Sequence, residues 1–270
     1  MFHSLSIVIT GGSTGLGFAI ADALAPQGAR LTLISRQTEN LDRAVRELRR
    51  RHAGADIEVQ AVDVGDPVAI AQAIEDIARR LGGIDMLFNN AGVMREGRFE
   101  TLADADFQAV MRTNFFGAVH VTRAALPHLR AAGGRLINIA SLAGLTGTFG
   151  FSAYGAAKHA LVGFTECLHY ELPPQGVTVH LVCPAEFDTP MVAALDCYRT
   201  PENRRHTLAI PRTPLEIVVA DTLRGIRRGR YFIVPGRRAR LAVLALRLFP
   251  ALARRHGARI VATPDRTPRV

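Results

Sequence analysis

The stretch Thr10-Gly11-Gly12-Ser13-Thr14-Gly15-Leu16-Gly17 decides the fold of this 270-residue chain. It ends an apolar run, residues 5–10, and is followed by a helical pattern over residues 18–25. A glycine turn between a first strand and a first helix lets backbone N–H groups and the helix N-terminus approach an anionic group such as a pyrophosphate. Glycine-rich turns also occur elsewhere, so the prediction depends on the position of this turn after the first strand.

Apolar runs and helical patterns alternate along the chain, which predicts an α/β fold with a Rossmann-type, doubly wound sheet of seven parallel strands and helices on both faces. Each run is short and rich in Ile, Val or Leu, as in strands that helices cover on both sides. In the helical segments, apolar residues recur at intervals of three and four. The predicted strands are 5–10, 30–35, 57–61, 84–89, 135–140, 177–182 and 231–234, and the predicted helices include 41–52, 68–81, 104–129 and 153–172.

The charge is unevenly distributed along the chain. The formal net charge is +9, yet residues 224–270 contain 13 arginines and a single acid, so the rest of the chain is slightly acidic. Aromatic residues make up 6% and Trp is absent, which leaves few side chains for stacking on nucleic-acid bases. No specific nucleic-acid partner is therefore expected.

Three cysteines without CxxC spacing predict neither a zinc site nor a disulfide framework. The first residues lack the pattern of an export signal, and no uncharged apolar stretch reaches the roughly 18 residues that a spanning helix needs. These features favour a cytoplasmic location.

Residues 1–235 are predicted to form one dinucleotide-binding and catalytic domain, and residues 236–270 an Arg-rich helical tail. Within the domain, residues 185–213 lack a convincing period and contain three prolines, so they are interpreted as an irregular insertion after the sixth strand. Ligands bind at the carboxyl ends of the strands in an open parallel sheet. The insertion is expected to form a substrate lid; a plain surface excursion is the alternative.

Arg36 follows the second predicted strand, where the adenosine ribose of a dinucleotide lies in this fold. An acid at this place holds the 2′-hydroxyl of NAD, whereas an arginine pairs with the 2′-phosphate of NADP. Arg36 therefore favours NADPH, with a chance surface arginine as the alternative.

Three side chains have the chemistry of a proton-transfer site: Ser141, Tyr154 and Lys158. Tyr154 and Lys158 are four residues apart in a predicted helix, so they lie on one face about one turn apart. A nearby ammonium stabilises the phenolate and lowers the pKa of tyrosine, which makes it able to exchange a proton with a carbonyl or alcohol oxygen. Ser141, at the end of the fifth strand, is placed to hydrogen-bond the same oxygen. Lys158 is the only lysine among 33 basic residues.

The chain resembles the short-chain dehydrogenases/reductases over roughly residues 5–235. Its glycine turn matches their TGxxxGxG motif, Asp63-Val64 their adenine-contacting pair, and Asn89-Asn90-Ala91-Gly92 their NNAG segment. Asn114, Ser141, Tyr154 and Lys158 match the catalytic tetrad. The cofactor-binding residues that the resemblance and the motifs indicate are Gly11, Ser13, Thr14, Gly15, Leu16, Gly17, Arg36, Asp63, Val64, Asn90, Ala91, Gly92, Tyr154, Lys158, Pro184, Phe187 and Thr189.

The resemblance also implies a role for each member of the tetrad. Tyr154 is expected to donate a proton as hydride passes from the nicotinamide to the carbonyl carbon. Lys158 is expected to lower its pKa and to hydrogen-bond the nicotinamide ribose. Ser141 is expected to polarise the carbonyl, and Asn114 to hold a water that links Lys158 to solvent. No metal is expected, because proton and hydride both have a donor.

The substrate is predicted from weaker signals. Residues 143–151 and parts of the segment 187–207 are similar to 3-ketodihydrosphingosine reductases and their bacterial relatives. This likeness favours a lipophilic ketone such as a 3-keto sphingoid base. Alternatives are a 3-oxoacyl thioester reductase, a hydroxysteroid dehydrogenase and, in another class, a noncatalytic NADPH-binding sensor. The family resemblance also predicts a homo-oligomer.

The tail has several interpretations. Apolar runs flanked by arginine between residues 237 and 255 suit a peripheral contact with anionic lipid. A helix packed on the domain or on a dimer partner is the alternative, and nonspecific nucleic-acid binding is a further one.

Overall fold

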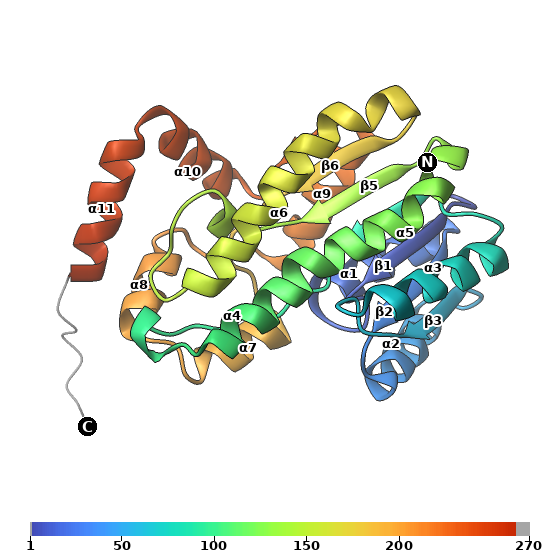
Figure 1. Cartoon of the computed structure of the whole chain (residues 1–270), viewed down its shortest axis with the longest axis horizontal. Coiled ribbons are helices and arrows are strands. Elements are labelled where there is room, and N and C mark those ends of the chain that lie inside the picture. The colour runs from blue at the N-terminus through green and yellow to red at the C-terminus, as the bar shows by residue number, and fades with distance from the viewer. Residues whose placement is uncertain (1, 263–270) are drawn as a thin grey trace.

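The computed structural model describes residues 2–262 and contains a seven-stranded parallel sheet in the order β3-β2-β1-β4-β5-β6-β7 (Figure 1). The order reverses between β1 and β4, which is the switch point where ligands bind in open α/β sheets. The strands are β1 (Ser6–Thr10), β2 (Arg30–Ser35), β3 (Ile57–Ala61), β4 (Met86–Asn89), β5 (Arg135–Ile139), β6 (Thr178–Val182) and β7 (Phe232–Ile233).

Helices cover both faces of the sheet. The main α-helices of the Rossmann-type body are α1 (Gly15–Leu24), α2 (Thr38–Arg51), α3 (Pro67–Leu81), α4 (Asp104–Met111), α5 (Gly117–Ala132), α6 (Ser152–Glu171) and α9 (Leu215–Arg227). After β6 come α7 (Pro190–Asp196) and α8 (Pro201–Leu208), and after β7 come α10 (Arg237–Leu248) and α11 (Pro250–Ala262).

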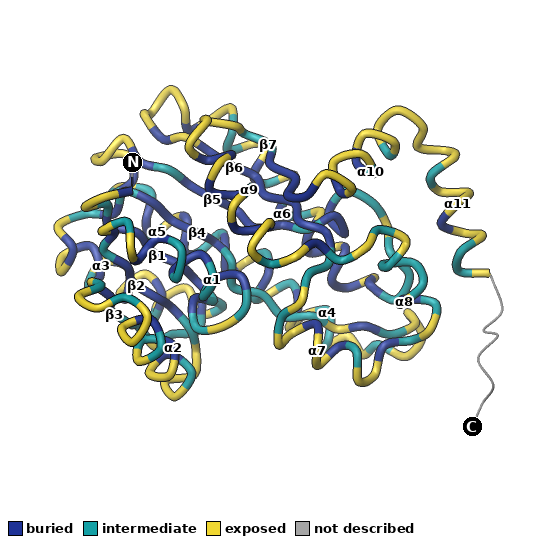
Figure 2. The backbone as a smooth tube through the Cα atoms, turned by 180° about the vertical axis from the view of Figure 1, so that it is seen from behind, coloured by how far each residue is buried: buried dark blue, intermediate teal, exposed yellow. Residues whose placement is uncertain are grey.

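The core has two principal layers. On one face, α1, α2 and α9 bury side chains such as Ile20, Leu41 and Leu223 against the sheet. On the other face, α3 and α5 bury side chains such as Ile74 and Val121. Strands covered in this way are almost fully buried (Figure 2), so their near-continuous apolar sequences have a direct physical cause. The predicted fold class is confirmed.

The insertion after β6 is more regular than predicted. Residues 185–213 contain α7 and α8 in place of a wholly irregular excursion. Thr189 and Thr200 cap these helices, and each is followed by a proline at the first helical position. Proline is favoured there because its missing N–H has no partner inside the helix. Two of the three prolines, Pro190 and Pro201, therefore begin helices, and Pro211 lies in the connection between α8 and α9.

A second difference concerns the predicted helix 104–129. The structure divides it into α4 and α5 around a π-helical turn, η3 (Arg112–Phe116). Such turns insert an extra residue into a helix and frequently occur at functional sites. Asn114 lies in this turn, so the turn determines the position of one residue of the predicted tetrad.

The described part of the tail forms α10 and α11, and its last residues, 263–270, lie outside the described part of the chain. Both views place α11 at the same end of the molecule as α8 (Figures 1 and 2). No helix within residues 2–262 is long and apolar enough to cross a membrane. The domain boundary at residue 235 stays a prediction.

Candidate active site

The glycine turn after β1 has the backbone geometry of an anion site. Gly11 and Gly15 have positive φ angles of 63° and 56°, a conformation that glycine adopts without steric cost. A Cβ atom on Gly17 would lie 2.4 Å from the Gly11 carbonyl oxygen, so only glycine fits there. No side chain caps the first N–H groups of α1 at Thr14. These donors are therefore available to a phosphate.

The segment after β4 fastens this turn. Asn90 donates its side-chain N–H to the carbonyls of Thr10 and Gly11, at 3.0 and 3.1 Å. The Thr10 hydroxyl accepts the backbone N–H groups of Asn90 and Ala91, both at 3.0 Å. Two loops from neighbouring strands are thus held as one unit at the switch point.

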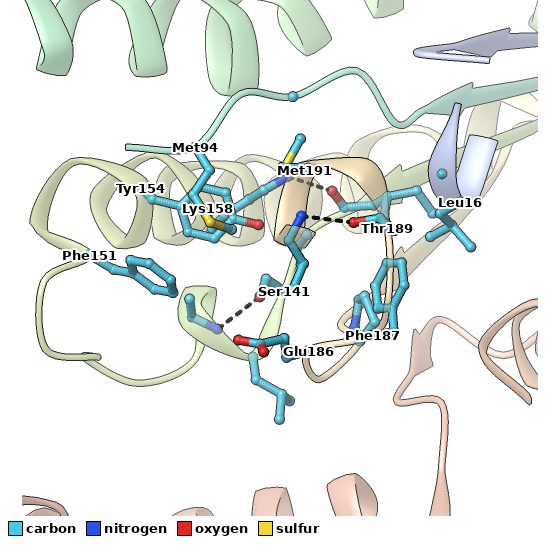
Figure 3. A pocket seen from close by; sticks show the side chains of 18 of the residues that line it. Leu16, Met94, Ser141, Phe151, Tyr154, Lys158, Glu186, Phe187, Thr189 and Met191 are labelled. Carbon is cyan, nitrogen blue, oxygen red and sulfur yellow. Dashed lines mark hydrogen bonds between the residues drawn. The ribbon is translucent and has the colours of Figure 1, made fainter. Parts of the chain in front are cut away.

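A cavity of about 660 Å³ opens at the carboxyl ends of the strands and contains most of the predicted site (Figure 3). Two predicted residues lie outside its lining: Gly17, whose role is close packing, and Asn114. The predicted residues that line the cavity are Gly11, Ser13, Thr14, Gly15, Leu16, Arg36, Asp63, Val64, Asn90, Ala91, Gly92, Ser141, Tyr154, Lys158, Pro184, Phe187 and Thr189.

Tyr154 and Ser141 approach each other inside the cavity. Tyr154 lies on the first turn of α6, and Ser141 lies two residues after the end of β5, where it caps the short helix η4 (Leu142–Gly144). Their side chains share a hydrogen bond. The phenol packs edge-on against the ring of Phe151, with centroids 5.4 Å apart. Two hydroxyls from different elements are thus held side by side, as protonation of one oxygen atom of a substrate requires.

Lys158 lies one helical turn after Tyr154, and its side chain is buried. Its ammonium Nζ donates to the Ile139 carbonyl at 2.9 Å and lies 5.7 Å from the centroid of the Tyr154 ring. Burial lowers the pKa of Lys158 to about 8. The same desolvation raises the pKa of the neighbouring Cys183 thiol to about 12.

The pKa of Tyr154 differs from the expectation. Burial raises it to about 12, although the hydrogen bond to Ser141 acts in the opposite direction. The lysine was expected to lower this pKa, but in the chain alone desolvation of the phenolate dominates. The phenol is therefore protonated at neutral pH, which suits a proton donor.

Asn114 is buried behind the cavity wall. Its Oδ1 accepts the Val93 N–H at 2.7 Å and its Nδ2 donates to the Val93 carbonyl at 2.8 Å. The π-helical turn directs it inward, where it holds the chain that follows Gly92. The water that the resemblance places on Asn114 stays a prediction.

Lys158→Met should change how stability depends on pH. Lys158 has a pKa of about 8 in the folded chain and an ordinary pKa of 10.5 when it is solvated, so between these values the unfolded chain binds more protons. Wild-type stability should therefore rise by up to about 3 kcal/mol relative to Lys158→Met as pH increases from 8 to 10.5. Urea unfolding at several pH values measures this.

Tyr154→Phe is the matched control, because it alters the same site and keeps the lysine. It should retain the wild-type rise of stability up to pH 10 and rise slightly further above pH 10, because it lacks the raised pKa of Tyr154. Parallel pH profiles for wild type and Lys158→Met would contradict the burial of a charged lysine.

Comparison with known proteins identifies the family. The family model described as short chain dehydrogenase matches residues 6–198. The chain belongs to the short-chain dehydrogenase family. It is therefore an oxidoreductase that acts on a carbonyl or CH–OH group, and its fold and family imply a nicotinamide cofactor.

Relatives of this short-chain dehydrogenase include several named reductases. The chain is 34% identical over 228 residues to a 3-ketodihydrosphingosine reductase of Mus musculus, covering 81% of this chain and 68% of the relative. It is 36% identical over 191 residues to a putative ketoacyl reductase of Streptomyces coelicolor, covering 70% and 72%. The crystal structure of a levodione reductase has a TM-score of 0.80 at 27% identity, covering 87% of this chain and 96% of that one.

The dehydrogenase cavity has one wall that the sequence did not predict. Helices α10 and α11 of the tail contribute small and apolar residues to the same cavity. The lining residues recur at intervals of three and four, so they lie on one face of each helix. This periodicity is the signal by which the sequence could have predicted the wall. The lining residues from the tail are Ala242, Ala245, Leu246, Ala253, His256, Gly257 and Ile260.

His206 of α8 lies between the tail helix α11 and the segment that contains Phe149. Its Nδ1 accepts the Phe149 N–H at 3.1 Å, and a Cβ atom on Gly257 would lie 2.9 Å from its Nε2. Gly257 therefore permits close contact between α11 and α8. Burial, and secondarily the neighbouring His256, lowers the pKa of His206, which favours its neutral imidazole.

An ion-pair network that the sequence also did not predict holds the insertion after β6, residues 185–213. Arg199 has a fully buried guanidinium that donates to Glu186 at 3.0 and 3.2 Å and to Asp196 at 2.9 Å. Arg212 donates to the same two carboxylates, at 2.8 and 2.6 Å. Glu186 lines the cavity (Figure 3), so the network links the segment after β6 to α7 and α8.

Proposed function

We propose that this short-chain dehydrogenase is an NADPH-dependent reductase that converts a ketone to an alcohol on a lipophilic substrate, with a 3-keto sphingoid base as the most specific candidate. One observation carries the proposal: the Tyr154 and Ser141 hydroxyls open into a cavity whose other walls are largely apolar. Met94, Phe151 and Met191 lie beside the hydroxyl pair, and the tail helices extend the apolar lining.

The residues present fit a dinucleotide. The uncapped N-terminus of α1 and the glycine turn would hold the pyrophosphate, and Asn90 fixes the turn. Asp63 lies at the adenine end of the site, where it accepts the Gly65 N–H at 2.9 Å and pairs with Arg112 at 2.8 Å. Thr189 lies at the nicotinamide end and caps α7. When bound, the cofactor supplies the hydride.

In reduction, Tyr154 donates its proton to the developing alkoxide oxygen and Ser141 orients that oxygen by a hydrogen bond. The raised pKa of Tyr154 keeps the proton in place until charge develops on the substrate. Lys158 then stabilises the tyrosinate that forms. Asn114 positions the backbone of Val93 at the edge of the cavity.

A substrate panel tests this function. NADPH oxidation by the purified protein is measured with long-chain 3-keto bases, 3-oxoacyl thioesters and ketosteroids side by side. The proposal expects the highest kcat/KM for the free keto lipid. Highest turnover of the thioester would assign the chain to the ketoacyl reductases, a name that several relatives carry, and highest turnover of a ketosteroid would favour a hydroxysteroid dehydrogenase. Cofactor binding without turnover would favour a noncatalytic sensor.

The prediction of NADPH in place of NADH rests on Arg36. It lines the cavity at the end of β2, is exposed, and has no ion pair to a carboxylate within residues 2–262. Arg36→Gln should raise the KM for NADPH by about 10- to 100-fold and leave the KM for NADH nearly unchanged, because only NADPH has the 2′-phosphate. Arg43→Gln, on α2 outside the cavity, is the control. An unchanged KM for NADPH would exclude this role.

We also propose that the tail contacts an anionic lipid surface. Large apolar side chains are exposed at Leu241, Leu244, Leu248, Phe249 and Leu252, next to arginines of the same helices. Apolar side chains flanked by arginine suit the interface of an anionic membrane. A surface of this kind would place the apolar cavity wall near the source of a lipophilic ketone.

Leu248→Asp with Phe249→Asp should weaken binding to phosphatidylglycerol vesicles at least tenfold, because two apolar side chains are replaced by anionic ones. Neither residue lines the cavity, so turnover of a soluble ketone should persist. Val68→Asp, at an exposed apolar site on α3, is the control in the vesicle flotation assay. Equal flotation of the wild type and both variants would exclude the proposed lipid contact.

A cytoplasmic location with peripheral membrane contact follows from this proposal. The homo-oligomer stays a prediction, which sedimentation velocity tests.

A further inference from the structure

A second cavity, of about 310 Å³, lies between α9, β7 and α10 and is separate from the catalytic cavity. Its floor includes the buried residues Gly225, Ile233 and Val234. β7 is the edge strand of the sheet, so this cavity is at the border of the fold. Five arginines line it: Arg224, Arg228, Arg230, Arg240 and Arg247.

The charge of this arginine cavity is poorly balanced. Asp221 is the single carboxylate in its lining. It accepts Arg224 at 2.7 Å and Arg240 at 3.3 Å, and its Oδ2 also accepts the Gly236 N–H at 2.9 Å. Both carboxylate oxygens are therefore engaged. The lining therefore has one carboxylate and five guanidiniums. The guanidiniums repel one another above the apolar floor, and a bound anion would reduce this repulsion.

Two of the guanidiniums are held in position before any ligand binds. Arg247 lies over the ring of Phe232, 4.5 Å from its centroid. Arg240 donates its Nε to the Gly236 carbonyl at 3.3 Å in addition to its contact with Asp221. In the part of the chain that the structure describes, Arg228 and Arg230 have no ion pair to a carboxylate, so their donors are available.

We propose that the arginine cavity is a binding site for a phosphate group. The planar guanidinium donates two parallel hydrogen bonds to an oxyanion, and several guanidiniums around one point match the multiple oxygens and the double charge of a phosphate monoester. The apolar residues Val243 and Leu244 in the same lining provide a surface for an organic substituent on that phosphate.

Helix α10 is shared by both cavities. Ala242, Ala245 and Leu246 line the catalytic cavity, whereas Arg240, Val243, Leu244 and Arg247 line the arginine cavity. A phosphate in the second cavity therefore contacts α10 on the side opposite the ketone site and stabilises the wall that the two cavities share.

Calorimetric titration of the whole protein tests this site. The protein is first saturated with the nicotinamide cofactor that it turns over, which fills the phosphate positions of the catalytic cavity. It is then titrated with inorganic phosphate and, separately, with dihexanoyl phosphatidate below its micellar concentration. Arg228→Gln with Arg230→Gln removes two donors that have no carboxylate partner. The matched control is Arg237→Gln with Arg238→Gln, which removes the same charge outside the cavity.

We expect saturable binding of one phosphate per chain. The Arg228 and Arg230 double variant should weaken it at least tenfold, whereas the control should change it less than threefold. Tighter binding of phosphatidate identifies a lipid headgroup as the natural source, and equal affinities identify a small phosphate. Absence of saturable binding, or equal weakening by both double variants, would overturn the proposal. Because the readout is binding, failure here leaves the ketone reductase assay unaffected.

Discussion

Tyr154→Phe is expected to lower kcat/KM for ketone reduction by about 10²- to 10⁴-fold, the range that a positioned general acid contributes. The substitution removes only the hydroxyl that shares a hydrogen bond with Ser141. The ring keeps its edge-on contact with Phe151, so the cavity should retain its shape. Cofactor affinity should change little, because the loss falls on proton transfer. Steady-state kinetics and cofactor titration of the same preparation measure both quantities.

The matched control is Tyr170→Phe. Tyr170 is the exposed tyrosine near the end of α6, so its hydroxyl can be removed without affecting the cavity. This variant should have wild-type kcat/KM. If Tyr154→Phe kept activity within twofold of wild type, another group would have to supply the proton.

Arg199→Met is expected to lower the free energy of unfolding by about 3 to 5 kcal/mol, the cost of removing one partner from a buried ion pair. Arg199 is fully buried and binds Glu186 and Asp196, and it also donates to Asn203 and Thr207 on α8. Methionine fills similar volume but leaves part of the carboxylate hydrogen bonding unsatisfied. Urea unfolding measures the change.

Arg204→Met provides the comparison for this network. Arg204 approaches the same Asp196 at 3.5 Å, but about half of its side chain is exposed. A solvated pair of this kind contributes roughly 0 to 1 kcal/mol. Equal destabilisation by the two variants would mean that burial of Arg199 does not determine its contribution to the free energy of unfolding.

The glycine turn and the pair of Tyr154 and Lys158 could be found in the sequence because their geometry is local, whereas Asn114 was predicted from the family resemblance. Gly11 and Gly15 need positive φ angles within one turn, and Tyr154 and Lys158 need one helical repeat between them. The strand positions were also predictable, since buried parallel strands have uninterrupted apolar sequences. These features depend on neighbours a few residues away.

Only the tertiary structure shows the ion pairs of residues 185–213 and the contribution of α10 and α11 to the cavity wall. Arg199 and Glu186 are 13 residues apart and belong to different segments, so no spacing rule joins them. The face of α10 that lines the cavity contains alanines, which in the sequence resemble any buried helix face. The pKa of Tyr154 also depends on complete burial, which the sequence does not specify.

The sequence by itself determined the parallel sheet and the glycine turn, because short-range periodicity and glycine conformation encode them, and its resemblance to the family supplied the predicted tetrad. The tertiary structure decided which groups surround the tetrad, how far burial shifts the pKa values of Tyr154 and Lys158, and where the arginines of residues 224–247 converge. Contacts between distant segments and loss of solvent set these properties, and neither has a local signature in the chain.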